Sequence, residues 1–300
     1  MTSPLISEIL AAARRPVLSY EFFPPKTKDR LDQLKRVAEE LKPTRPDFVT
    51  VTHGAGGSSQ GRTLEACAHL RSAGFAVVMP HLTCIGASRE ELCETIDAYY
   101  EEGYRNIMCL RGDPPRGESH FQKHPDGLAH ANELIALVKK RHPDICCGAA
   151  GYPEVHQEAL SPESDLLYLK SKVEAGASFI TTQLFFDNRD YYDYCERCEL
   201  AGINVPIIAG IMPITSLPNL ERMADMAAGA RVPAPLLRSL DWAEGKDYVR
   251  NAGIHWATEQ IRDLLHQGVA GIHLYTLNNS YASMQICESL GLRSYQSICS

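Results

Sequence analysis

The sequence predicts an α/β fold, a (β/α)8 TIM barrel, in which residues 1–300 form a single catalytic domain. Eight apolar runs bounded by turn residues recur along the chain, mostly beginning about 30 residues apart, and amphipathic segments with helical spacing lie between them. Because the runs are continuous rather than alternating, they fit parallel strands that are buried on both faces. Eight consecutive strand–helix units favour a closed barrel over an open sheet.

The expected strands share a high content of apolar residues and end in polar or turn-forming residues. They cover residues 16–23, 48–53, 76–84, 104–112, 145–152, 179–186, 206–212 and 271–277.

The expected helices are rich in charged residues and carry an apolar stripe. They cover residues 29–41, 60–72, 89–102, 129–141, 162–175, 189–201, 217–227 and 246–267. Ser88 and Ser161 are suited to cap two of them, and Pro162 suits a first helical position. The Pro-containing stretch 231–240 is expected to connect the last two helices. No linker or shift of composition marks a second domain.

Composition and charge exclude several classes of protein. A net charge of −7 argues against a nucleic-acid binder. No apolar stretch approaches the roughly 18 residues that span a bilayer. The apolar run 9–13 precedes Arg14 and Arg15, the reverse of the order in a signal peptide, so we expect a cytoplasmic protein. Its ten cysteines are then expected to be reduced, and the Cys195–Cys198 spacing, with no second such pair, does not predict a metal site.

Polar residues stand where the strands end, the edge at which barrels of this kind carry their chemistry. Glu21 lies between aromatic residues, and a carboxylate there is costly to desolvate in its charged form, which suits a general acid. The alternative is a structural carboxylate paired with a buried Arg or Lys. Gln183 offers a donor and an acceptor together, as the amide edge of a heterocycle would require.

Other polar residues at these ends allow two interpretations each. His81 suits a binding site or a core. Arg111 and Asp113, separated by Gly112, can offer a cation and an anion to one ligand or form an ion pair in a turn. Asp165, Tyr168 and Lys172 share one helical face, for which a solvated surface is the alternative.

Taken in order, the strand ends resemble those of the methylenetetrahydrofolate reductase family. The matching pieces are EFFPP at 21–25, VTHGA at 51–55, HLTC at 81–84, LRGD at 110–113, YPEVH at 152–156, TQLFFD at 182–187 and HLYTLN at 273–278. The resemblance runs from about residue 16 to residue 292. It implies a TIM barrel that binds FAD and reduces methylenetetrahydrofolate to methyltetrahydrofolate, in one-carbon metabolism and methionine biosynthesis.

The resemblance also implies the roles of individual residues. Glu21 would be the general acid that protonates a folate nitrogen in a ping-pong hydride transfer through FAD. Asp113, Gln183 and Tyr275 would bind the substrate. The implied FAD contacts are Thr52, His53, Ala55, His81, Arg111, Gly112, Asp113, Ala131, Tyr152, His156, Asp165, Tyr168 and Lys172. NADH, NADPH or a protein would donate the electrons, and the family suggests a homo-oligomer.

Four positions depart from the bacterial pattern. His53, Tyr168, Leu217 and Asn279 stand where Tyr, Asn, Phe and Arg are common, so we expect altered flavin and folate contacts. The C-terminal regulatory domain of the eukaryotic enzymes is not expected. A pterin-binding methyltransferase, a flavin-free reductase and a non-catalytic flavin or folate binder are the alternatives. The set of Arg111, Asp113, His156 and Lys172 favours a flavin, and intact Glu21 and Gln183 favour catalysis.

Overall fold

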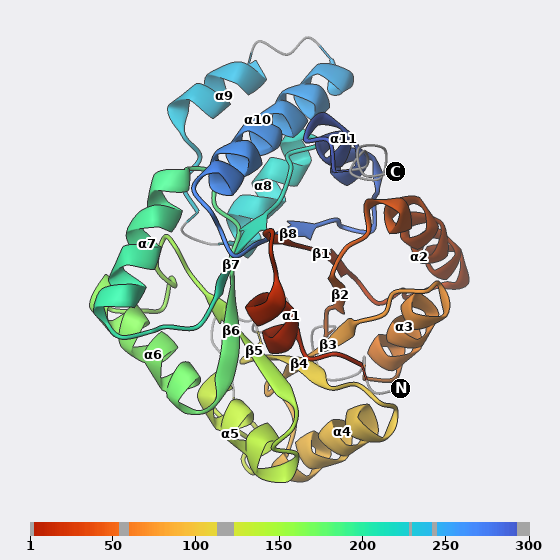
Figure 1. Ribbon diagram of the computed structural model, residues 1–300, viewed down its shortest axis with the longest axis vertical. Helices are drawn as coiled ribbons and strands as arrows, with labels where there is room; N and C mark the ends of the chain where they lie inside the picture. The colour runs from red at the N-terminus through yellow and green to blue at the C-terminus, as the bar shows by residue number, and fades with distance from the viewer. Residues whose placement is uncertain (1–2, 54–59, 113–122, 228–229, 242–244, 293–300) are drawn as a thin grey trace.

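Eight parallel strands close into a barrel in the order β1-β2-β3-β4-β5-β6-β7-β8 (Figure 1). The computed structural model describes residues 3–53, 60–112, 123–227, 230–241 and 245–292. The strands are β1 (Val17–Phe22), β2 (Phe48–Val51), β3 (Val78–Thr83), β4 (Asn106–Leu110), β5 (Cys146–Gly151), β6 (Ala177–Thr182), β7 (Ile207–Ile211) and β8 (Gly271–Tyr275). Their closure confirms the predicted TIM barrel, and each predicted strand overlaps one of these, with ends that differ by a few residues.

The predicted helices are also found, on the outside of the barrel. They are α2 (Lys28–Leu41), α3 (Gln60–Ser72), α4 (Arg89–Glu101), α5 (Ala131–Arg141), α6 (Pro162–Glu174), α7 (Asn188–Leu200), α8 (Leu217–Met226) and α10 (Lys246–His266), and a short 3-10 turn, η1 (Lys42–Thr44), follows α2. Ser88 and Ser161 accept the backbone N–H three residues on, and so cap α4 and α6 as predicted.

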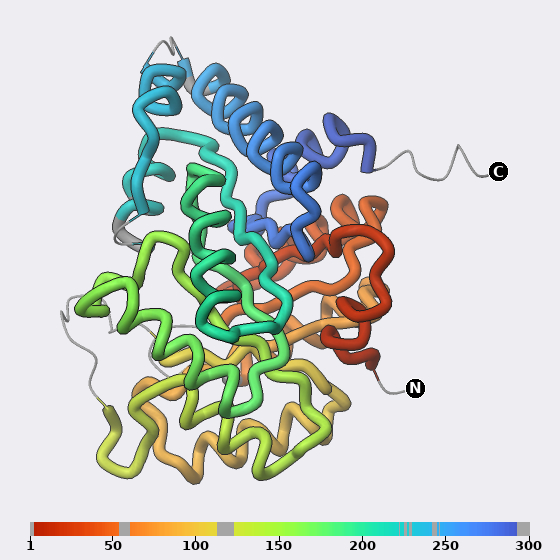
Figure 2. Tube along the Cα trace, turned by 60° about the vertical axis from the view of Figure 1, so that its left-hand side comes forward, coloured from red at the N-terminus to blue at the C-terminus, as the bar shows by residue number. Residues whose placement is uncertain are grey.

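The connector predicted at 231–240 is wrong, because most of it is a helix. α9 (Ala234–Asp241) lies beside α10, as Figure 2 shows at one end of the molecule. Pro235 is the second residue of α9, where the backbone needs no N–H donor. Leu236 and Leu240 are buried in a cluster that includes Val249 of α10, so burial of an apolar stripe stabilises this short helix.

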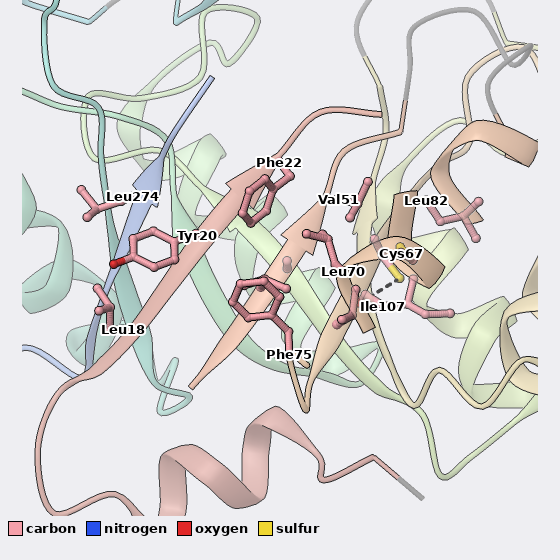
Figure 3. Packing of buried hydrophobic residues seen from close by; sticks show 14 of the residues in the cluster. Leu18, Tyr20, Phe22, Val51, Cys67, Leu70, Phe75, Leu82, Ile107 and Leu274 are labelled. Carbon is pink, nitrogen blue, oxygen red and sulfur yellow. Dashed lines mark hydrogen bonds between the residues drawn. The ribbon is translucent and has the colours of Figure 1, made fainter. Parts of the chain in front are cut away.

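Side chains along each strand alternate between the barrel lumen and the surrounding helices. On β1, Leu18, Tyr20 and Phe22 belong to the large cluster between strands and helices (Figure 3). Val17 instead packs in the lumen with Phe48 and other residues from several strands. Ser19 and Glu21 lie at every second position after Val17, so their side chains are on the lumen side as well. The alternation therefore directs the polar residues of β1 into the barrel.

Helix α1 (Ile6–Ala12), which was not predicted, closes one end of the barrel. It lies across the centre of the ring of strands in Figure 1, and Ile6 is fully buried against the lumen residues. The Asn106 side chain accepts a hydrogen bond from the Ile6 backbone N–H at 2.7 Å and donates one to the Pro4 carbonyl at 2.9 Å. α1 thus covers the N-terminal ends of the strands, opposite to the ends that carry the candidate site.

The cysteines were expected to be reduced. None of the nine cysteines in the described ranges forms a disulfide, and burial raises the pKa of Cys195 and of Cys198. Within the same ranges no group of three or more His, Cys, Asp or Glu side chains is arranged to hold a metal ion.

The longest described helix, α10, and the other described helices are too short or too polar to cross a membrane. A last helix, α11 (Tyr281–Ser289), was not predicted and follows β8.

Asn106→Ala should lower the free energy of unfolding by about 1–3 kcal/mol, because the buried Ile6 N–H and the Pro4 carbonyl would lose their partner. Urea unfolding measures the change. Ser3→Ala is the control, since its hydroxyl makes only an exposed 3.4 Å hydrogen bond to Ala76. Equal losses in the two variants would contradict this account of α1.

Candidate active site

One carboxylate and two imidazoles meet in the lumen at the C-terminal side of the barrel. Glu21 of β1 is 8% exposed, and its Oε2 lies 3.8 Å from Nε2 of His273 on β8 and 3.9 Å from Nε2 of His81 on β3. The pairing of β1 with β8 sets Ser19 opposite His273, and the Ser19 hydroxyl lies 2.8 Å from Nδ1 of that ring. The structure therefore places both His81 and His273 beside Glu21.

The surroundings of Glu21 differ from those of a structural ion pair. Among the described residues, its ion-pair partners are only the two histidines. Burial lowers the pKa of His81 to about 4, against the raising effect of Glu21, so this imidazole is neutral near pH 7. The paired Arg or Lys of the alternative interpretation is thus not found in the described ranges. A buried carboxyl beside a neutral imidazole is a suitable group for proton transfer.

Tyr275 of β8 connects this cluster to β6. Its hydroxyl donates a 2.6 Å hydrogen bond to the Thr182 carbonyl, and its ring stands edge-on to that of His273. Gly210 makes room for it, because a Cβ there would meet the Tyr275 hydroxyl at 2.7 Å. Burial raises the pKa of Tyr275, and Glu21 adds to the shift, so the phenol stays protonated. Gln183, directly after β6, uses its side-chain oxygen to accept the Leu184 N–H at 2.9 Å.

A second group of residues lies where β4 and β5 end. Lys172 of α6 donates a 2.9 Å hydrogen bond to the Ala150 carbonyl, and its ammonium lies 5.7 Å from the centre of the Tyr152 ring. Tyr152 stands edge-on to His156 at 4.6 Å between ring centres. Arg111 follows β4. Burial lowers the pKa of both His156 and Lys172, and the charge of Arg111 adds to both shifts.

On the helical face of Asp165, Tyr168 and Lys172, Tyr168 is 58% exposed, whereas Asp165 and Lys172 are half-buried. Burial lowers the pKa of Lys172 to about 8, with Asp165 opposing the shift, and burial raises the pKa of Asp165. The alternative of a wholly solvated face is therefore wrong for the two charged residues. A cation in such a position suits an anionic ligand beside Lys172, which would favour its charged form.

Comparison with known proteins identifies the family. The family model described as methylenetetrahydrofolate reductase matches residues 5–291. The 5,10-methylenetetrahydrofolate reductase of Escherichia coli (strain K12) is 37% identical over 277 residues, covering 92% of this chain and 91% of that protein. The chain belongs to the methylenetetrahydrofolate reductase family.

Other relatives differ in length or share only the fold. Methylenetetrahydrofolate reductase (NADH) 1 of Arabidopsis thaliana is 37% identical, covering 91% of this chain and 48% of that protein, so the chain spans about half its length. A solved protein from Clostridium thermocellum, which binds two copies of 5-methyl-5,6,7,8-tetrahydrofolic acid, has a TM-score of 0.67 and 15% identity. It covers 96% of this chain and 98% of its own. At this identity the likeness concerns the fold.

The remaining residues implied by the resemblance to methylenetetrahydrofolate reductases lie in different surroundings. Thr52 and His53 follow β2, and Nδ1 of His53 is buried without a hydrogen-bond partner among the described residues. Gly112 adopts φ +93°, and a Cβ there would meet Ile85 at 2.5 Å. Ala131 begins α5 and has no polar side-chain atom that could join it to either group. Ala55 and Asp113 lie outside the described residues, so their roles stay predictions.

The other two departures from the bacterial methylenetetrahydrofolate reductases have definite positions. Leu217 is the first residue of α8 and is 50% exposed. Asn279 precedes α11, and its side-chain oxygen accepts the Tyr281 N–H at 3.0 Å. Neither position has an aromatic ring or a positive charge to offer a ligand.

Three residues near these groups were missed as site residues: Ser19, Glu158 and His273. His273 and Ser19 share their strand parity with Tyr275 and Glu21, which is a signal that the sequence carried. Glu158 had no such signal, because its contact with Arg111 joins a turn to a distant strand end.

We expect the Lys172 ammonium to titrate near pH 8, because its burial disfavours the charged form. NMR of the protein with ¹³C-labelled lysine follows this titration, and Lys172→Arg identifies the signal by its loss. Binding of an anion beside Lys172 should weaken as the pH rises through 8. A signal that titrates near the ordinary 10.5 of lysine would contradict the buried position.

Proposed function

We propose that this protein is a FAD-dependent methylenetetrahydrofolate reductase that takes electrons from NADH or NADPH. The observation that carries the proposal is the position of Glu21, a lumen carboxyl without an Arg or Lys partner in the described ranges, in a chain of this family. The folate ligand named for the Clostridium thermocellum neighbour is compatible with a pterin at such a barrel mouth.

The described residues suit FAD in charge and in polarity. Lys172 and Arg111 supply two cations, and the Lys172 ammonium, with its lowered pKa, would gain from a neighbouring diphosphate. The unpartnered Nδ1 of His53 offers a polar atom at the end of β2. The Tyr152 ring lies beside Lys172, with its centre 5.7 Å from the ammonium, and adds an aromatic surface to the two cations. When bound, FAD would supply the hydride chemistry, which no side chain can perform.

Glu21 has the position to move a proton onto the substrate. Reduction of methylenetetrahydrofolate requires that one nitrogen of its five-membered ring be protonated and leave the bridging carbon. Glu21 is proposed as the acid that supplies this proton, because no Arg or Lys in the described ranges pairs with its carboxyl. Tyr275 and Gln183 lie at the ends of β8 and β6, with β7 between them, where their polar groups can orient a pterin. Asp113 is proposed for the same contact.

The electron donor is proposed from the family relatives. The plant proteins that match this chain are named as NADH enzymes, and NADH or NADPH is the corresponding proposal here. A nicotinamide and a folate would occupy the same face of the cofactor in turn, which gives ping-pong kinetics.

The purified protein should be yellow and should release FAD on denaturation. Under anaerobic conditions NADH or NADPH should bleach the flavin band, and methylenetetrahydrofolate should restore it with formation of methyltetrahydrofolate. A protein that takes up no FAD, even when it is added in excess, would contradict the flavin-dependent function.

Glu21→Gln should slow the folate half-reaction by about 10²- to 10⁴-fold, because Gln keeps the size of Glu but lacks a transferable proton. Reduction of the flavin by the nicotinamide should change little, since it requires no acid. Anaerobic stopped-flow at the flavin band measures the two halves separately. Equal losses in both would indicate that Glu21 has a structural role.

A further inference from the structure

The Arg111 guanidinium is already paired with a carboxylate. Its Nη2 lies 2.9 Å from Oε1 of Glu158 and its Nη1 lies 2.5 Å from Oε2, so both carboxylate oxygens face the fork of the guanidinium. The Arg111 side chain is 21% exposed and that of Glu158 is 44% exposed. Such a two-fold pairing is the geometry that an arginine also offers to a phosphate.

Glu158 is held in this position by a residue of the same group. It lies in the turn between β5 and α6, and its backbone N–H donates to Nδ1 of His156 at 3.1 Å. The Ala159 N–H donates to the His156 carbonyl at 2.8 Å, which tightens the turn. The contact of His156 with Tyr152 links the turn to the end of β5. The Glu158 carboxylate is therefore directed at Arg111 by the residues that surround Lys172.

We propose that Glu158 is an internal competitor for the anion-binding edge of Arg111, displaced when a diphosphate binds. The inference rests on the proposed function, because FAD would supply that diphosphate. Glu158 occupies the Nη1–Nη2 edge of Arg111, and a diphosphate that approaches this edge needs the same two N–H donors. Glu158 is nearly half exposed and can turn into solvent at small cost, because exposed ion pairs contribute little stability.

The competition has a consequence for ligand affinity. Binding must first release Arg111 from Glu158, so the observed affinity is reduced by the fraction of molecules in which the pair is closed. Lys172 differs from Arg111, since its ammonium donates a hydrogen bond to the Ala150 carbonyl, whereas the Arg111 guanidinium is paired with a carboxylate. Glu158 thus sets the affinity for the diphosphate, and Lys172 offers a cation that needs no such release.

Glu158→Gln tests this role, because the amide retains the size of Glu but no longer pairs as an anion with Arg111. The dissociation constants for FAD and for inorganic pyrophosphate are measured on the apoprotein by calorimetry. We expect both ligands to bind about three- to tenfold more tightly. Glu163→Gln is the matched control, since it removes the same charge from the exposed first turn of α6. Its effect should stay below about twofold.

The tighter ligand binding expected of Glu158→Gln should depend on Arg111. In an Arg111→Met background, Glu158→Gln should no longer increase the affinity for either ligand. Glu158→Asp, whose shorter side chain pairs less well with the fork, should tighten binding in the same direction. Unchanged or weaker binding of FAD and pyrophosphate in Glu158→Gln would overturn the inference while leaving the proposed function intact. If no variant binds FAD but Glu158→Gln still binds pyrophosphate more tightly, the proposed function fails and the role of Glu158 stands.

Discussion

The pairing of the first strand with the last is the contact on which the candidate site depends. β1 and β8 are joined in register from Val17 opposite Gly271 to Glu21 opposite Tyr275, across a separation of about 250 residues. The close approach requires a glycine, because a Cβ on Gly271 would meet the Val17 side chain at 2.3 Å. Once this register is formed, strand parity brings His273 and Tyr275 into the lumen beside Glu21.

Burial has different effects on the residues around Glu21 and on the residues around Lys172. In the lumen, it keeps the His81 imidazole neutral and the Tyr275 phenol protonated, so these two neighbours of Glu21 are uncharged near pH 7. Beside β5, it disfavours the charged forms of Lys172 and Asp165, although these residues remain close enough to oppose each other's shifts. The residues around Glu21 are thus suited to proton transfer, and the residues around Lys172 are suited to bind an anion.

Most of the fold was predictable because its strands and the helices between them are specified locally. Continuous apolar runs of Ile, Val and Phe predict buried parallel strands, and serines such as Ser88 predict where helices begin. The short helix α9 escaped prediction since its formation depends on burying Leu236 and Leu240 against α10. Helix α1 was missed for the same reason, because its position depends on contacts with the barrel lumen and with Asn106.

By itself, the sequence determined the barrel, the family and the polar residues at each strand end, because these follow from local pattern and from the order of motifs. Only the tertiary structure decided which of those residues meet. The two imidazoles around Glu21 depend on barrel closure, and the Glu158 carboxylate reaches Arg111 across 47 positions of the chain. The shifted pKa of Lys172 likewise depends on the burial of its ammonium. Contacts and burial of this kind join segments that are distant in the chain, and no local pattern specifies them.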